Sequence, residues 1–438
     1  MIPVKLKEFI ALLPLTFSIL YPTVTGSGSI HDAFLSEKAT IIPSNILGSI
    51  QHKTQNKIKI YIFKITIIMF IPISQPSITQ KEIDYVNDAV TSTWISSLGK
   101  YIDRFETEFA DFCQSRYAIC VSNGTVAIQL ALAAYDIGAG DEVIMPNLSF
   151  IATANATLHS GAKPVFADID PENLCIDPKK IEALITPNTK AIMPVHLYGH
   201  PAQMDVIIEI AHKHNLLVIE DAAEAHGATV NGKRVGSWGN CATFSFYGNK
   251  NLTTGEGGMI TTDDEDFYNR CRYLRDHAMS KEKRYWHTAP GFNFRMTNLQ
   301  AAVGVAQLEQ LDKLVEKKRW IGNLYHELLG DIREFQLPID QREYAENIYW
   351  VFGIVLNDCS YSVQEICTHL SKNKIGTRPF FWPMHEQPVY LKQGLFNDTS
   401  LPNSEFLARN GFYLPSGLGI TETEIRTVAH CLKDFIND

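Results

Sequence analysis

Between residues 117 and 221, short apolar runs alternate with helical segments, and this alternation constrains the fold of the chain most strongly. Runs such as Leu216–Glu220 carry consecutive Val and Ile without intervening polar residues, which is typical of strands buried on both faces. The pattern predicts an α/β protein with a mostly parallel sheet and helices on both faces. We expect strands over 117–121, 142–145, 164–168, 191–195 and 216–220, and helices over 126–135, 151–160 and 204–214.

The chain beyond this region predicts a second, smaller unit. Residues 300–316 carry one long helical pattern that leads out of the sheet. After it we expect a strand over 350–356, a helix over 362–373 and a final helix from Thr421, which together describe an α+β unit. We therefore predict a large domain over residues 69–315 and a small C-terminal domain over residues 316–438.

Residues 1–68 differ in kind from the rest of the chain. They hold seven Lys and three acidic residues, a net charge of +4, whereas the whole chain carries -9. Lys5 and Lys7 precede an apolar run over 9–20 that imitates an export signal. We interpret residues 1–68 as an extension outside the working protein, translated ahead of a natural start at Met69. An export signal and a disordered or membrane-touching segment are the alternatives.

Composition excludes several classes of function. The net charge of -9 and the lack of a basic stripe argue against a nucleic-acid-binding protein. None of the eight cysteines lies in a CxxC pair or near a histidine cluster of zinc-ligand spacing, so no metal site is predicted. The cysteines are typical of reduced thiols in a cytoplasmic protein. The apolar run over 58–73 is short and interrupted by lysines, so no stable membrane insertion is expected.

Residues 244–258 place Lys250 between an apolar run and a glycine cluster, with Ser245 nearby. A lysine in this position can be held away from bulk water, and desolvation lowers the pKa of its amine and frees it to attack a carbonyl. These are the requirements of a lysine that forms a Schiff base with pyridoxal phosphate. A surface-loop lysine is the alternative interpretation of these residues alone.

Three further candidates lie at predicted strand ends or helix starts. Gly124 and Thr125 open a helix directly after a strand, where free N–H groups bind phosphate or merely cap the helix. Asp221 ends a buried run and could pair with a protonated pyridine nitrogen, or with another residue of the protein. Phe150 could stack on a planar ring or pack in the core. Ligands collect at the carboxyl ends of parallel strands, so we expect one shared pocket.

Over these motifs, from about residue 71 to the C-terminus, the chain resembles the DegT/DnrJ/EryC1/StrS sugar-nucleotide aminotransferases. The segments that carry the resemblance are residues 122–125, 194–199, 220–227, 244–258 and 291–302. The resemblance implies the pyridoxal-phosphate-dependent transferase fold of the aspartate aminotransferase type, with residues 69–315 as the cofactor-binding domain. It also implies pyridoxal 5′-phosphate as the cofactor and a homodimer with shared active sites.

The resemblance implies a role for each matching residue. Lys250 would be the catalytic lysine that forms the aldimine, and Asp221 would hold the pyridine nitrogen with Glu224 near the phenolic oxygen of the ring. The other implied contacts are Gly124, Thr125 and Ser245 with the phosphate, Phe150 with the ring face, Asn293 with a phosphate in the neighbouring subunit, and Arg378, Phe380 and His385 with the sugar nucleotide.

The implied activity is transfer of an amino group from L-glutamate to C4 of a nucleotide-linked 4-keto-6-deoxy sugar. Residues 245–250 and 377–385 resemble the branch of the family that aminates GDP-4-keto-6-deoxy-D-mannose for lipopolysaccharide O-antigen biosynthesis. A UDP- or dTDP-linked acceptor is the first alternative, and a non-catalytic, cofactor-binding regulator is the second.

Two other enzymatic classes are disfavoured. A sibling dehydratase branch carries histidine at the position of Lys250, so the lysine argues against dehydration. A dinucleotide-dependent dehydrogenase is disfavoured because no GxGxxG motif follows a predicted strand.

Overall fold

The computed structural model describes residues 17–20, 40–43, 70–357 and 361–437. The chain divides into two compact units, Met1–Met69 and Phe70–Asp438. In the first unit, β1 (Phe17–Leu20) pairs antiparallel with β2 (Thr40–Pro43). The other residues of 1–69 lie outside the described residues. They include most of the signal-like run and Met69, on which the interpretation of this extension depends.

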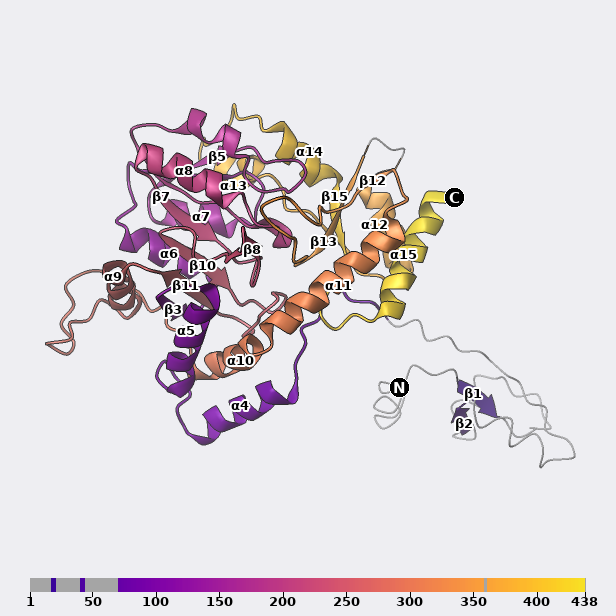
Figure 1. Ribbon diagram of the computed structural model, residues 1–438, viewed down its shortest axis with the longest axis horizontal. Helices are drawn as coiled ribbons and strands as arrows, with labels where there is room; N and C mark the ends of the chain where they lie inside the picture. The colour runs from indigo at the N-terminus through magenta and orange to yellow at the C-terminus, as the bar shows by residue number, and fades with distance from the viewer. Residues whose placement is uncertain (1–16, 21–39, 44–69, 358–360, 438) are drawn as a thin grey trace, which may run out of the picture. The chain divides into compact units, whose positions relative to one another are not determined.

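A seven-stranded sheet forms the centre of the second unit (Figure 1). The strand order is β3-β11-β10-β7-β6-β4-β5, and the five strands from β10 to β5 run parallel. Only β11 runs antiparallel to both of its neighbours in this sheet. The mostly parallel sheet predicted from the apolar runs is therefore confirmed. The strands are β3 (Tyr117–Val121), β4 (Glu142–Pro146), β5 (Lys163–Ala167), β6 (Thr189–Ile192), β7 (Leu217–Asp221), β10 (Cys241–Ser245) and β11 (Gly258–Thr262).

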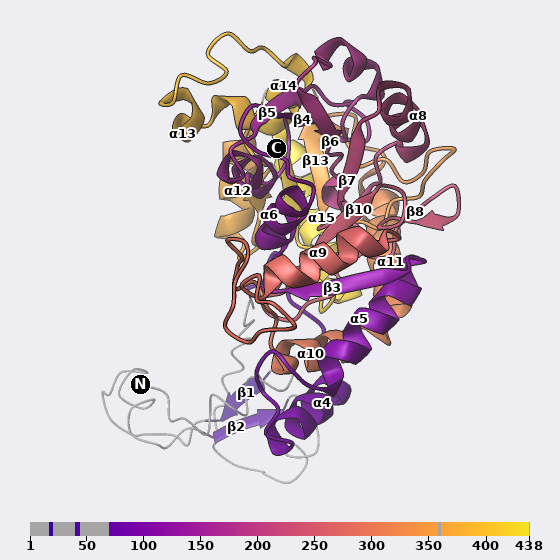
Figure 2. The ribbon, with the colours of Figure 1, turned by 90° about the vertical axis from the view of Figure 1, so that its left-hand side faces the viewer.

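Helices cover both faces of this sheet, as predicted. Successive residues of a strand point to opposite faces, so each strand contributes to two cores. In β3, Ala118 and Cys120 join one buried cluster, while Ile119 and Val121 join the other. This division explains why the strand sequences are apolar throughout. Figure 2 shows α6 and α9 on the side of the sheet that faces the viewer. The first cluster includes α5 (Lys100–Cys113) and α8 (Met204–His214), and the second includes α6 (Gly124–Ala134), α7 (Ala152–His159) and α9 (Glu265–Arg275).

The helix predicted over residues 300–316 is two helices, α10 (Asn298–Leu308) and α11 (Leu311–Leu329). At the break, the Gln310 N–H donates to the Gln307 carbonyl oxygen three residues back, which tightens the last turn and ends α10. The carboxylate of Glu309 turns away and accepts a hydrogen bond from Tyr85 of α4 (Gln80–Thr91). The prediction of a single helix was wrong because tertiary contacts of Glu309 override a continuous local pattern.

The C-terminal part contains a four-stranded antiparallel sheet of order β12-β13-β15-β14, which α11 links to the large sheet (Figure 1). The expected smaller α+β unit is therefore present. The predicted boundary at residue 315 falls within α11, and the division into domains over 69–315 and 316–438 stays a prediction. The elements are β12 (Phe335–Gln336), β13 (Phe352–Leu356), α12 (Val363–Lys372), β14 (Arg378–Pro379), α13 (Pro388–Leu391), α14 (Pro402–Asn410), β15 (Gly411–Leu414) and α15 (Glu422–Asn437).

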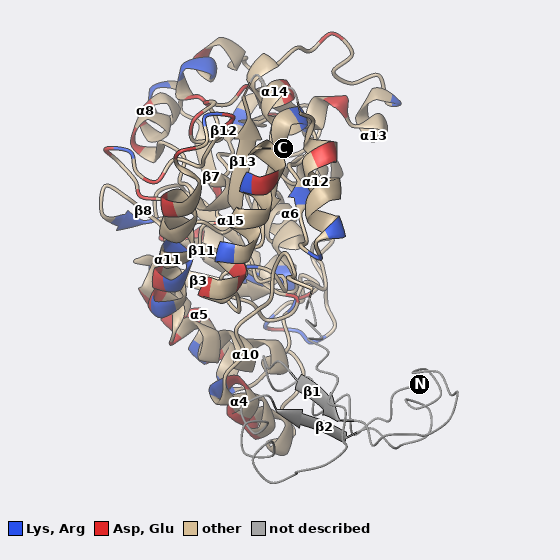
Figure 3. Cartoon of the chain, turned by 90° about the vertical axis from the view of Figure 1, so that its right-hand side faces the viewer, with Lys and Arg blue, Asp and Glu red and all other residues tan. Residues whose placement is uncertain are grey.

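Charged residues are mixed on the face shown in Figure 3, where both basic and acidic positions occur on helices such as α4, α11 and α12. Such interspersed charge is typical of a solvated protein surface. Within the described part of the chain, no helix combines the length and the apolar character that a membrane crossing needs.

Candidate active site

A cavity of about 790 Å³ lies at the carboxyl ends of β3, β7 and β10, beside the first turn of α6. Its position follows from the parallel strands, whose ends and following turns meet at one edge of the sheet. The cavity brings together seven of the residues singled out in the sequence: Gly124, Thr125, Phe150, Asp221, Glu224, Ser245 and Lys250.

Lys250 follows β10 in a turn that holds its side chain at only 10% exposure. Its Nζ lies 3.4 Å from Oε1 of Glu224 and 3.7 Å from the centroid of the Trp350 ring. Burial lowers the pKa of Lys250, although the Glu224 and Asp221 carboxylates act in the opposite direction. A lysine whose pKa is lowered offers a larger fraction of neutral, nucleophilic amine near neutral pH.

Asp221 ends β7 as a buried carboxyl at the cavity wall. The Thr153 hydroxyl donates to Oδ2 at 2.8 Å, and the Ala223 N–H donates to Oδ1 at 3.2 Å. Burial raises the pKa of Asp221, and the Thr153 hydrogen bond opposes that shift. A cationic ligand atom beside this carboxyl would favour its ionised form and offset the cost of burying it.

Glu224 lies on the other side of the lysine. Its Oε2 accepts a hydrogen bond from the backbone N–H of Tyr198 at 3.0 Å, while Oε1 faces Lys250. Burial raises the pKa of Glu224, and the nearby Lys250 ammonium opposes the rise. Tyr198 holds this orientation from a turn in which its own φ is 54°, an uncommon value for a residue with a side chain.

The first turn of α6 forms an anion-binding corner of the cavity. Asn123 caps the helix, since its Oδ1 accepts a hydrogen bond from the Val126 N–H at 3.0 Å. Gly124 lies against Ser245, and a Cβ added to Gly124 would come within 2.7 Å of the Ser245 Cβ. The glycine therefore allows a helix N-terminus to meet a strand end closely, an arrangement suited to a phosphate.

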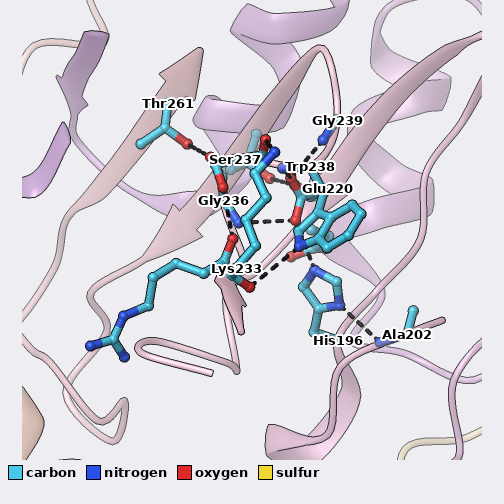
Figure 4. A network of polar contacts seen from close by, with 12 residues as sticks. His196, Ala202, Glu220, Lys233, Gly236, Ser237, Trp238, Gly239 and Thr261 are labelled. Atoms are coloured by element: carbon cyan, nitrogen blue, oxygen red, sulfur yellow. Dashed lines mark hydrogen bonds and ion pairs between the residues drawn. The ribbon is translucent and has the colours of Figure 1, made fainter. Parts of the chain in front are cut away.

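A buried polar network fixes the end of β7 from the opposite face (Figure 4). Glu220 accepts backbone hydrogen bonds from Gly236, Trp238 and Gly239 at 2.8–2.9 Å. His196 Nδ1 accepts from the Ala202 N–H, so its proton is on Nε2, which donates to Glu220 at 3.1 Å. Burial acts to raise the pKa of Glu220, but these hydrogen bonds outweigh burial and lower it. Strand alternation then directs the adjacent Asp221 toward the cavity.

The other predicted site residues lie outside the main cavity. Arg378 lines a second cavity of about 380 Å³, which shares Tyr247, Asn249, Trp350 and Tyr413 with the first. Phe380 is 2% exposed and packs against the Tyr198 ring at 4.9 Å. Asn293 is exposed and lines neither cavity.

His385 is also buried away from both cavities. Its Nδ1 donates to Oδ1 of Asn147 at 3.1 Å, and its Nε2 lies 3.4 Å from Glu405. His385, Glu386 and Glu405 are close enough to surround a metal ion, but Arg409 already donates to Glu386 at 2.6 Å. This cluster therefore behaves as an ion-pair network that fixes the 384–386 turn.

A comparison with known protein families decides the class of protein. Residues 76–433 match the model of the DegT/DnrJ/EryC1/StrS aminotransferase family. The chain belongs to this family. The resemblance seen in the motifs is thereby confirmed, and the chain is a pyridoxal-phosphate-dependent aminotransferase.

Individual relatives are similar over almost their full length. A GDP-perosamine synthase of Caulobacter vibrioides is 46% identical over 367 residues, which cover 84% of this chain and 98% of the relative. The X-ray structure of an aminotransferase from Psychrobacter cryohalolentis aligns with a TM-score of 0.80 at 32% identity, covering 84% of this chain and 99% of that one. A putative sugar aminotransferase from Streptococcus pneumoniae, in its PLP form, aligns with a TM-score of 0.79 at 27% identity, covering 83% and 98%.

These similarities confirm the predicted transferase fold, and the chemistry of the cavity fits the cofactor. The α6 corner suits the phosphate, and the buried Asp221 carboxyl suits a protonated pyridine nitrogen. The Lys250 amine suits the aldehyde carbon.

Proposed function

We propose that this chain transfers an amino group from L-glutamate to C4 of GDP-4-keto-6-deoxy-D-mannose, giving GDP-perosamine. The observation that carries the chemistry is the buried Lys250 amine, which faces the Glu224 carboxylate in the same cavity as Asp221 and the α6 corner. The choice of acceptor is supported by the relative named GDP-perosamine synthase, which matches over 98% of its length.

In this proposal the cavity residues bind and orient pyridoxal phosphate. Gly124, Thr125 and Ser245 would hold its phosphate, and Asp221 would keep its ring nitrogen protonated, since all four line the cavity. Phe150 would cover the ring face, and Glu224 would lie near the phenolic oxygen. The bound cofactor withdraws electrons from the α-carbon of the amino acid and so makes the proton on that carbon acidic.

Lys250 moves the proton. As a neutral amine, its Nζ accepts the proton from the α-carbon of glutamate, and as an ammonium it donates a proton at the next step. Glu224, 3.4 Å away, stabilises the ammonium without holding it in a short hydrogen bond. In the second half of the reaction the same amine works in reverse and donates a proton to C4 of the sugar.

We assign Arg378 to binding the pyrophosphate of the sugar nucleotide, because Arg378 lines the cavity next to Lys250. Binding energy from this remote group would position the ketone at C4. Phe380 and His385 are buried, so we assign them to supporting the 377–386 segment that carries Arg378.

We also propose a homodimer in which Asn293 reaches the phosphate site of the other subunit. Exposed apolar residues on one short segment support this: Ile83, Val90, Trp94, Ile95 and Leu98. The described cysteines are free, which fits the cytoplasmic location that we propose for this O-antigen precursor enzyme.

A substrate panel tests the proposed acceptor. Purified protein with pyridoxal phosphate and L-glutamate is offered GDP-, UDP- and dTDP-linked 4-keto-6-deoxy sugars, and amino-sugar products are measured by mass spectrometry. We expect the highest kcat/KM with the GDP sugar. A preference for a UDP or dTDP sugar would overturn the GDP-perosamine assignment while leaving the aminotransferase chemistry intact.

A further inference from the structure

Trp350 is one of the four residues that line both cavities, although no motif in the sequence pointed to it. It is only 5% exposed. Its ring centroid lies 3.7 Å from Nζ of Lys250. An ammonium over an indole face is attracted by the ring electrons, and Trp is the strongest of the aromatic side chains in this interaction.

Three contacts fix the position of Trp350. Its indole Nε1 donates to the backbone oxygen of Asn249, next to the lysine, at 2.8 Å. Its own carbonyl oxygen accepts from Nζ of Lys318 at 2.7 Å. Lys318 in α11 is buried, and it also donates to the carbonyl oxygen of Ser416. Trp350 is therefore held both at its backbone and at the edge of its indole ring.

The turn that orients Glu224 also supports Trp350. The Tyr198 N–H donates to Glu224, and the carbonyl oxygen of the next residue, Gly199, accepts from the Ile348 N–H at 3.1 Å. The two segments approach so closely that a Cβ on Gly199 would lie 2.5 Å from the backbone N of Trp350. One turn thus fixes the groups on both sides of Lys250.

We propose that Trp350 is a positioning residue for Lys250, whose indole face holds the protonated amine beside Glu224 between proton transfers. This inference rests on the proposed role of Lys250. An aromatic face suits the task because it attracts the ammonium but offers little hold on the neutral amine. The amine is therefore retained while it carries the proton and released when it has given the proton up.

The charges around Lys250 define the expected titration. Glu224 is in contact with it, and Asp221 and His226 act on it at longer range. The two carboxylates favour the ammonium, while burial, together with any charge on His226, opposes it. Removing the indole removes one stabilising contact of the ammonium, so the pKa of Lys250 is expected to fall further.

The test measures the titration of Lys250 without the reaction. Apoprotein is trace-labelled with acetic anhydride across a pH series, and the extent of modification of Lys250 is read by peptide mass spectrometry. Relative to the parent, Trp350→Leu should lower the labelling midpoint by about half to one pH unit. Trp350→Phe should lower it less, because a weaker aromatic face remains.

Trp320→Leu is the matched control, since Lys317 lies 3.5 Å from the Trp320 ring centroid and neither residue lines the cavities. This variant should shift the midpoint of Lys317 and leave that of Lys250 unchanged. An unchanged Lys250 midpoint in Trp350→Leu would overturn the inference. If Trp350→Leu does not fold, Trp350→Met replaces it as the non-aromatic variant, and an unchanged Lys250 midpoint there would overturn the inference in the same way.

A parallel measurement tests the proposed role of Lys250 separately from the positioning role of Trp350. Parent protein is loaded with pyridoxal phosphate, reduced with borohydride and mapped by mass spectrometry. Failure of the cofactor to attach to Lys250 would overturn the proposed function. Attachment to Lys250 with an unchanged labelling profile in Trp350→Leu would overturn only the positioning role of Trp350.

Discussion

At the scale of the residue, the site places three ionisable side chains where charge is disfavoured. Burial raises the pKa of Asp221 and Glu224 and lowers the pKa of Lys250. A carboxyl whose pKa is raised in the folded state contributes stability below its unfolded pKa and loses that contribution as the pH rises through the folded value. The apoprotein is therefore expected to lose the contribution of these carboxyls as the pH rises from their unfolded pKa values through their raised folded values.

Asp221→Asn should separate stability from function. Without a buried carboxylate, the apoprotein should gain about 1 kcal/mol of unfolding free energy at pH 7, a gain that disappears at low pH. The loss of the partner for the ring nitrogen should weaken cofactor binding about tenfold or more. Denaturant unfolding of the apoprotein and cofactor titration measure the two effects.

The exposed Asp398 provides the control, since Asp398→Asn should change neither quantity. A loss of apoprotein stability in Asp221→Asn, or unchanged cofactor affinity, would contradict the role given to this carboxyl.

At the scale of the element, the sequence predicted what short segments determine. The strand over 117–121 and the helix after it follow from local pattern, so the α6 corner could be predicted. The break at Glu309 could not, because it depends on contacts with α4, more than 200 residues earlier. Trp350 was missed for the same reason, since it meets Lys250 only through folding and belongs to no local motif.

Gly124→Ala tests the α6 corner as an element. The added Cβ would lie 2.7 Å from the Ser245 Cβ, so the strand end and the helix start must move apart where the phosphate binds. We expect cofactor affinity to fall about tenfold or more while the protein stays folded. Fluorescence titration of the apoprotein with pyridoxal phosphate measures the change.

Gly419→Ala is the matched substitution, because a Cβ there meets only ordinary contacts at 3.5 Å or more. This variant should bind the cofactor like the parent. Equal affinities in the two variants would refute a phosphate site at the start of α6.

At the scale of the whole molecule, the cavities and the family match lie within residues 70–438. The change in sequence character near residue 69 predicts a boundary there, because it is a property of composition over many residues, and the division into domains stays a prediction. The sequence did not predict that Phe380 and His385 are buried. Residues 377–385 could be recognised as a motif, but only three-dimensional packing shows the burial of these two side chains.

A chain that begins at Met69 should retain the activity of the full chain. Since both cavities are built from the second unit, kcat/KM for amine transfer should agree within about twofold, and the thermal midpoint of that unit should be unchanged. Steady-state kinetics and calorimetry of both proteins provide the measurement. A large loss of kcat/KM on truncation would show that residues 1–68 belong to the working enzyme.

The central claim is that Lys250 is the lysine that holds the cofactor and moves the proton. Its most direct test compares the parent with Lys250→Ala, using Lys190→Ala as a control that removes an exposed lysine outside both cavities. After loading with pyridoxal phosphate and reduction with borohydride, peptide mapping should find the cofactor on Lys250 alone in the parent and in Lys190→Ala, and on no lysine in Lys250→Ala. Attachment to a different lysine in the parent, or amine transfer that persists in Lys250→Ala, would contradict the account.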